Sequence, residues 1–153
     1  MRKLVVHPER CTGCRLCEST CALYVDRIND LGRSRIRIVK RHSQGLAAPM
    51  VCHQCKSPPC LVACPVGAIK KEPEGLVTID AELCIGCEAC VTQCPFGVMI
   101  VVNDKVVKCE FCSGDPQCVK YCATVAIEYA DPENVARQRR TKSGNLLLQE
   151  QEI

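Results

Sequence analysis

Sixteen cysteines in 153 residues fall into four runs of four, and this arrangement constrains the chain more than any other feature of its sequence. The first and third runs have the spacing C-x2-C-x2-C-x3-C, and the other two lengthen only the middle gap. Four copies of nearly one spacing predict four equivalent sets of metal ligands. The runs are Cys11, Cys14, Cys17 and Cys21; Cys52, Cys55, Cys60 and Cys64; Cys84, Cys87, Cys90 and Cys94; and Cys109, Cys112, Cys118 and Cys122.

This spacing is typical of ferredoxin-type chains, in which thiolates enclose a 4Fe-4S cluster and the fourth cysteine of a run binds the neighbouring cluster. Proline follows the fourth cysteine in the second and third runs, as Pro65 and Pro95, and this too is typical of such runs. Ala22 and Ala123 stand at the same place in the other two runs, which changes the local turn but removes no ligand. The sequence therefore predicts four 4Fe-4S clusters.

Two other uses of cysteine have to be weighed. A disulfide framework suits a short secreted chain, but the N-terminal MRKLVVHPER has no apolar signal segment. Structural zinc is held by cysteine pairs a dozen or more residues apart, whereas Cys11, Cys14 and Cys17 lie within seven residues. A structural zinc protein remains an alternative to the iron-sulfur interpretation.

The composition fits clusters at the centres of packing. Hydrophobic residues make up 47% of the chain, but this figure includes the cysteines, and only five side chains are aromatic. We therefore expect folding to be coupled to cluster assembly.

The formal net charge of +3 becomes negative once sixteen thiolates bind cluster cores. Basic stretches at 33–41 and 137–142 are interpreted as a protein docking surface or a solvated face; without a recognition motif, no nucleic-acid partner is expected.

Internal repetition suggests how the runs are grouped. Segments 64–69, 94–99 and 122–127 are variants of one phrase, in which a short helix end leads into a strand. A turn at 72–75 and a strand at 76–79 join the second run to the third. The expected fold is α+β, with two bicluster ferredoxin-like modules, one inserted in the other. Residues 46–98 form the inner module, residues 1–45 plus 99–131 the outer module, and residues 132–153 a C-terminal helix or tail for docking.

This nesting predicts the ligand sets if each fourth cysteine crosses to the partner cluster. A tandem order, which pairs run one with run two and run three with run four, stays open on spacing alone. The nested sets are Cys11, Cys14, Cys17 and Cys122 for cluster 1; Cys109, Cys112, Cys118 and Cys21 for cluster 2; Cys52, Cys55, Cys60 and Cys94 for cluster 3; and Cys84, Cys87, Cys90 and Cys64 for cluster 4.

Other elements can be predicted coarsely. Alternation predicts an edge strand over 35–39, and residues 99–108 predict a hairpin that turns at Asn103-Asp104. Asp131-Pro132 predicts a helix start. The leucines at 146–148 are expected either to pack on the domain or to anchor in a partner. No run of 18 apolar residues occurs, so no membrane span is expected.

The sequence gives little support for catalysis by this chain. If all sixteen cysteines are ligands, no thiol is free to act as a nucleophile and no iron has an open position. His7, His42 and His53 form no cluster in the sequence. His53, inside the second run, either tunes a cluster through a hydrogen bond or is simply exposed. The chain is expected to carry electrons and not to be an enzyme itself.

Several motifs resemble a known family. They are the segments 11–17 (CTGCRLC), 51–60 (VCHQCKSPPC), 84–87 (CIGC) and 107–112 (VKCEFC), with Asp115-Pro116. Together they are similar to the four-cluster ferredoxin subunits of complex oxidoreductases, which include those of dimethyl sulfoxide reductase, formate dehydrogenases, hydrogenases and carbon monoxide dehydrogenase. The resemblance spans residues 9 to about 129, and the family's nested ligand pairing is the one given above.

Two segments narrow the resemblance. The segment Ser34-Arg35-Ile36-Arg37-Ile38 and the short segment Gly114-Asp115-Pro116 resemble the corresponding segments of the polyferredoxin subunit found with tungsten aldehyde oxidoreductases. This resemblance implies a cytoplasmic complex with a catalytic tungsten- or molybdenum-pterin subunit and an FAD- or NAD-binding subunit. Copies could also associate into longer electron wires. The rivals are the subunit of another enzyme in the family, an iron-sulfur maturation factor, and a small sensor or enzyme with one labile cluster.

Overall fold

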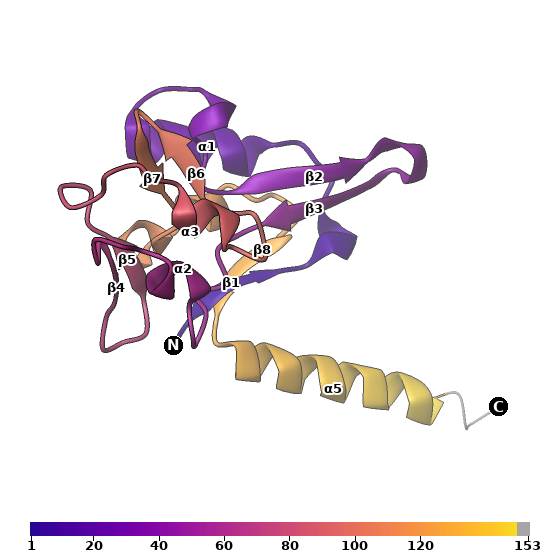
Figure 1. Cartoon of the computed structure of the whole chain (residues 1–153). Coiled ribbons are helices and arrows are strands. Elements are labelled where there is room, and N and C mark those ends of the chain that lie inside the picture. The colour runs from indigo at the N-terminus through magenta and orange to yellow at the C-terminus, as the bar shows by residue number, and fades with distance from the viewer. Residues whose placement is uncertain (150–153) are drawn as a thin grey trace.

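Short helices and two-stranded sheets make up the molecule, which is an α+β fold as the sequence predicts (Figure 1). The computed structural model describes residues 1–149. Within them, the strands pair into four separate two-stranded antiparallel sheets. An isolated hairpin is only marginally stable in water, so these sheets need further packing partners.

The strands are β1 (Lys3–Val6), β2 (Arg37–Arg41), β3 (Leu46–Met50), β4 (Ile69–Lys71), β5 (Val77–Ile79), β6 (Ile100–Val102), β7 (Lys105–Val107) and β8 (Ile127–Ala130). The α-helices are α1 (Leu16–Asp26), α2 (Pro59–Val62), α3 (Ala89–Thr92), α4 (Gln117–Lys120) and α5 (Pro132–Gln149). Short 3-10 turns cover Pro8–Arg10, Leu31–Arg33, His42–Gln44 and Phe111–Gly114.

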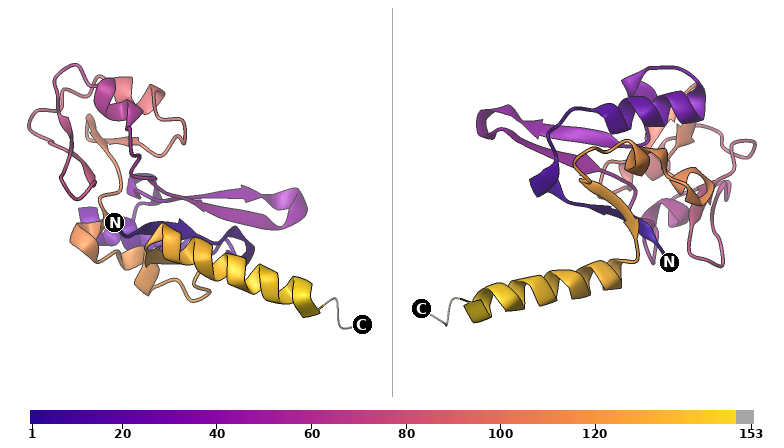
Figure 2. Two further views of the ribbon diagram at one scale, coloured as in Figure 1. Left: turned by 90° about the horizontal axis from the view of Figure 1, so that it is seen from below. Right: turned by 180° about the vertical axis from the view of Figure 1, so that it is seen from behind.

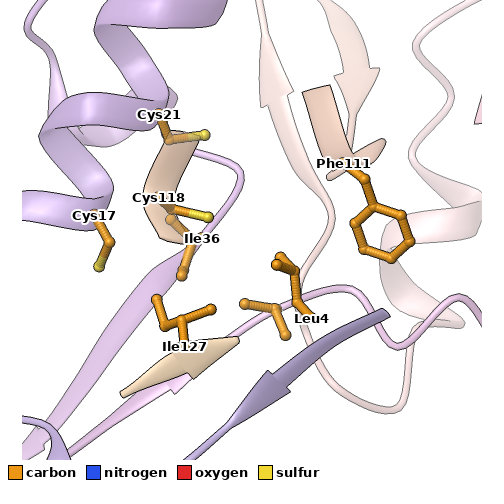
Figure 3. Packing of buried hydrophobic residues seen from close by; sticks show 8 residues of the cluster. Leu4, Cys17, Cys21, Ile36, Phe111, Cys118 and Ile127 are labelled. Atoms are coloured by element: carbon orange, nitrogen blue, oxygen red, sulfur yellow. The ribbon is translucent and has the colours of Figure 1, made fainter. Parts of the chain in front are cut away.

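The first and last parts of the body come together. Strand β1 pairs with β8, with Lys3 opposite Ala130 and Val6 opposite Ile127, and helix α1 packs against α4. The first and fourth cysteine runs therefore meet in space. The buried cluster between them contains Leu4, Ile36, Val51, Phe111 and Ile127 together with Cys17, Cys21 and Cys118 (Figure 3).

A second buried cluster lies in the middle of the chain. Helices α2 and α3 pack on each other, and the β4-β5 and β6-β7 hairpins and the loops beside them contribute further residues. The second and third runs meet here. The members of this cluster are Ala68, Ile69, Val77, Met99 and Val106 together with Cys84 and Cys90. Both packing centres of the described chain thus include cysteines.

The predicted strand over 35–39 is wrong by two residues, because the observed strand β2 begins at Arg37. Arg35 turns inward instead, where its guanidinium pairs with the Asp26 carboxylate and also donates to a backbone carbonyl. Ile36 is 2% exposed and belongs to the first buried cluster. Two consecutive buried side chains cannot alternate across a strand, so the regular pairing with β3 starts after them.

The predicted hairpin over 99–108 is confirmed as β6 and β7. Asn103 and Asp104 form its turn with positive φ angles of 49° and 58°, as a type I′ turn requires. Strands β4, β6 and β8 each begin a few residues after the fourth cysteine of a run, which confirms the repeated phrase.

Helix α5 begins as predicted, with Asp131 accepting a hydrogen bond from the Glu133 amide at 3.0 Å. Val135 is buried near its start and Arg139 bonds to His7 in the body, but the later part of α5 extends away from the body, on the same side as the β2-β3 hairpin (Figure 2). Leu147 is 64% exposed, so it does not pack on the domain. The side chains of Leu146 and Leu148, and residues 150–153, lie outside the described part. Over residues 1–149, no helix combines the length and apolar character needed to cross a bilayer.

Candidate metal centres

Cysteines from the second run and one from the third surround a pocket that opens to solvent and contains about 370 Å³ of space, solvent included. Pro58, Val77 and Met99 supply apolar walls. His53 stacks on Phe96 with ring centroids 3.9 Å apart, and both rings line the pocket. The cysteines that line it are Cys52, Cys55, Cys60 and Cys94.

Two further pockets repeat this pattern, each with about 310 Å³ of space by the same measure. Both combine three cysteines of one run with the fourth cysteine of another. Cys84, Cys87, Cys90 and Cys64 line one, and Cys11, Cys14, Cys17 and Cys122 line the other. Three pockets of similar size with the same four-thiol lining suit one kind of group, bound three times.

The fourth group lies in a wider groove, lined by Cys21, Cys109 and Cys112. Cys118 shares the first buried cluster with Cys21, and the charges of Cys109, Cys21 and Cys112 all act on it. Figure 3 shows the sulfurs of Cys21 and Cys118 pointing the same way, while that of Cys17 points elsewhere. Cys21 therefore faces cysteines of the fourth run and not the rest of its own run.

The loops that carry the cysteines bend through left-handed backbone conformations. Arg15, Gln54 and Glu88 each lie inside a cysteine run with φ of 65°, 47° and 58°. Such turns direct successive amide groups toward one side, which makes a concave site for anions. Gly86 has φ of 70°, and a Cβ there would lie 2.3 Å from the carbonyl oxygen of Asp104, so only glycine fits.

Backbone amides also donate to the fourth cysteines of two runs, each of which lines the pocket of another run. The amide of Ala68 donates to Cys64 Sγ at 3.3 Å, and that of Ala126 donates to Cys122 Sγ at 3.2 Å. The repeated phrase produces both bonds, because each joins a fourth cysteine to the residue four positions later. Although burial opposes it, the amide of Ala68, together with those of Val66, Gly67 and Ile69, lowers the pKa of Cys64. Amide donors favour sulfur in its thiolate form, which is the form that binds metal.

Burial raises the pKa of several other thiols. It raises the pKa of Cys17 to about 12, with help from the Glu18 carboxylate, and that of Cys109 to about 12. It also raises the pKa of Cys118. A buried thiolate without a counterion is costly, so these thiols keep their protons until a metal displaces them. Within residues 1–149, no three His, Cys, Asp or Glu side chains converge tightly enough to hold a single metal ion.

The four groups adjoin one another in a series. Cys17 shares one buried cluster with Cys21 and Cys118, which places the first group beside the groove. Lys108 lines both the groove and the Cys52 pocket, and Cys60 and Cys94 pack against the buried cluster that contains Cys84 and Cys90. The series therefore runs from the Cys11 pocket to the Cys21 groove, the Cys52 pocket and the Cys84 pocket.

Sequence reasoning missed three buried polar residues near these groups. Gln54, Glu18 and Lys108 are all at most 4% exposed, and each follows or precedes a cysteine in the sequence by one or two positions. Glu18 accepts from Arg15 Nε at 2.5 Å and from the Ile38 amide at 3.2 Å. Their position inside or beside a cysteine run could have indicated a role near the clusters. It does not identify them by itself, because exposed residues such as Lys56 occupy similar positions.

The three histidines lie apart. His7 is buried, with Nε2 2.6 Å from a Glu128 carboxylate oxygen and Nδ1 3.0 Å from Arg139. His42 is exposed in a turn. His53 contacts Phe96, and burial together with Lys3 lowers its pKa.

The basic stretch 33–41 does not form one continuous surface, because Arg35 is buried against Asp26 and Arg37 donates to the carbonyls of Leu31 and Gly32. Arg35 is buried and Arg37 is half-buried, and both guanidinium groups bond to partners within this chain.

Comparison with known proteins identifies the family. A family model described as a 4Fe-4S dicluster domain matches residues 43–132, and one described as a 4Fe-4S binding domain matches residues 8–24. The putative electron transport protein YsaA of Escherichia coli is 37% identical over 152 residues, covering 90% of this chain and 95% of that protein.

A second relative is the polyferredoxin-like subunit of an aliphatic sulfonate oxidoreductase from Pyrococcus furiosus, 41% identical over 122 residues, with 78% of this chain and 70% of the relative covered. Among solved structures, the active site complex BamBC of benzoyl coenzyme A reductase contains a chain of similar fold, with a TM-score of 0.51 and 19% identity over 100% of this chain and 98% of that one. The chain thus belongs to the 4Fe-4S dicluster family of ferredoxin-type electron-transfer subunits.

Proposed function

We propose that this chain is an electron-transfer subunit that holds four 4Fe-4S clusters. The observation that carries the proposal is the gathering of the cysteines into four groups: fifteen of them line three pockets and one groove, and Cys118 shares a buried cluster with Cys21 beside that groove. Bound to four thiolates, a 4Fe-4S cluster accepts and donates single electrons. The proposed ligands are Cys11, Cys14, Cys17 and Cys122; Cys109, Cys112, Cys118 and Cys21; Cys52, Cys55, Cys60 and Cys94; and Cys84, Cys87, Cys90 and Cys64.

The proposal includes two nested modules. The outer one combines residues 1–45 and 99–131, and the β1-β8 pairing and the packing of α1 on α4 support it. The inner one covers residues 46–98, supported by the packing of α2 on α3. Residues 132–153 are the docking tail, which agrees with the way α5 leaves the body.

Electrons are proposed to enter and leave at the two ends of the series. Cys14 and Cys87 are exposed, whereas the other fourteen cysteines are buried or half-buried. These two thiols belong to the first and last pockets. Exposed apolar side chains stand beside each, Leu16 and Tyr121 at one end and Ile85 at the other. Small apolar contacts of this kind suit the transient docking of redox partners.

The proposed partners are a catalytic tungsten- or molybdenum-pterin subunit, most specifically an aldehyde oxidoreductase, and an FAD- or NAD-binding acceptor subunit, in a cytoplasmic complex. A relative named as a subunit of an oxidoreductase supports the assembly with a catalytic chain. This chain itself is proposed to be non-catalytic, since all sixteen cysteines are committed as ligands.

The test is anaerobic purification through a tag on this chain, with co-purifying subunits retained. Tungsten in the same peak, with bleaching of the iron-sulfur absorption when an aldehyde is added, is the expected result. Molybdenum with bleaching by another substrate would reassign the partner. Clusters that stay oxidised with every substrate the complex turns over would contradict a role in electron transfer and favour a maturation factor.

A further inference from the structure

Lys108 is a buried lysine between two of the cysteine groups. Its side chain is 4% exposed, and it follows strand β7 and precedes Cys109. It lines both the Cys52 pocket and the Cys21 groove. Its ammonium donates to the carbonyl oxygen of Cys109 at 3.0 Å. One positive charge therefore stands at the junction of the second and third groups of the series.

No carboxylate balances this charge within the described residues, where none of the ion pairs includes Lys108. A buried cation without an anionic partner is costly, so such a residue is expected to face an anion. The nearby groups that become anionic are cysteines. The charge of Lys108 acts on Cys52 and Cys60, where it opposes the larger effect of burial on their pKa values.

A 4Fe-4S cluster with four thiolate ligands carries a net negative charge, which becomes more negative on reduction. A fixed positive charge beside it therefore stabilises the reduced state more than the oxidised state. Since the site is buried, solvent and salt screen this effect less than they would at the surface.

We propose that Lys108 tunes electron transfer: its charge raises the reduction potential of the cluster held by Cys52, Cys55, Cys60 and Cys94. Electrons that enter at either end of the series then preferentially reduce this interior cluster. This inference rests on the proposed function, because it requires clusters in these groups.

Lys108→Met removes the charge at nearly constant side-chain length. One component in an EPR-monitored redox titration is expected to become at least about tenfold harder to reduce, equivalent to about 59 mV for a one-electron couple. Lys108→Arg keeps the charge and should leave that component near the wild-type potential. Lys56→Met is the matched control, because Lys56 adjoins Cys55 but is exposed, so its loss should shift the component much less.

Iron and acid-labile sulfide are measured on every variant. An unchanged potential in fully loaded Lys108→Met, or an equal shift in Lys56→Met, would overturn the proposal. If Lys108→Met loses iron, Lys108→Gln is titrated instead, since its amide can still donate to Cys109. Loss of iron from both neutral variants would also overturn it and assign Lys108 a structural role. Wild-type protein without 4Fe-4S signals would reject the proposed function itself, which separates the two failures.

Discussion

The side-chain amide of Gln54 donates a hydrogen bond of 2.7 Å to the backbone carbonyl of Cys109, which joins the second cysteine run to the fourth. The Gln54 amide oxygen accepts from the backbone amide of Val77 at 2.8 Å, and the side chain is 1% exposed. One buried side chain thus satisfies two backbone groups from distant parts of the chain. The two cysteine groups at the centre of the series are held in place across this bridge.

Replacing Gln54 with leucine should destabilise the protein, because the buried Val77 amide loses its partner and the Cys109 carbonyl loses one of its two donors, keeping only Lys108. A cost of about 2 kcal/mol or more is expected, which lowers the thermal midpoint by roughly 4–8 °C. Anaerobic thermal unfolding of the loaded protein measures this. Gln93→Leu is the control, because Gln93 also lies inside a run but is exposed. Equal midpoints for the two variants would show that the bridge contributes nothing.

The ligand pairing can be tested by counting iron. In the nested arrangement Cys11 and Cys122 bind one cluster, so the double variant Cys11→Ala/Cys122→Ala should lose about 4 Fe, as each single variant does. In the tandem arrangement the two cysteines bind different clusters, and the double variant should lose about 8 Fe. Iron and sulfide analysis of the three purified variants distinguishes the two results.

Charge placed beside the exposed thiols should impair exchange with partners. Leu16→Glu and Ile85→Glu put a carboxylate into an apolar contact, and a cost of about 1.4 kcal/mol would slow electron transfer about tenfold. The measurement is stopped-flow reduction by, or oxidation with, the co-purified subunits. Val62→Glu serves as control, since Val62 is 84% exposed but lines neither end pocket. Rates that stay at the wild-type value in both end variants would argue for contacts elsewhere.

Arg139 fastens helix α5 to the body through His7 Nδ1 and the Val6 carbonyl. Arg139→Ala should free the start of the helix, with an expected cost of about 1–2 kcal/mol, so that local opening becomes roughly tenfold more frequent. Faster cleavage by trypsin within α5 would report this. Arg140→Ala removes a tryptic site from the same helix at an exposed position, and should leave cleavage of the remaining sites at the wild-type rate.

Local patterns predicted much of the fold. The turn residues Asn103 and Asp104 specified a hairpin, and Asp131 with Pro132 specified a helix start, because both signals act within a few residues. The strand at 35–39 was misplaced because the side chain of Arg35 is drawn inward by Asp26, a contact nine positions away. Strand β1 pairs with β8 across more than 120 residues of sequence. No short sequence pattern specifies such a pairing, so the partner of each strand could not be predicted.

The candidate site divides in the same way. Cysteine spacing predicted all sixteen candidate ligands, because the ligands of a ferredoxin-type run are separated by only two to five residues in the sequence. The buried roles of Gln54, Glu18 and Lys108 depend on partners 20 or more residues away or on neighbouring pockets, as in the bond from the Ile38 amide to Glu18. Arginines at 35 and 37 likewise read as surface charge until their internal partners are known.

Anaerobic quantification of iron, acid-labile sulfide and zinc in the protein purified from its host tests the central claim most directly. Four 4Fe-4S clusters predict about 16 Fe and about 16 sulfides per chain, with little zinc. About four zinc ions per chain without labile sulfide would contradict the electron-transfer account and return the sixteen cysteines to a structural role.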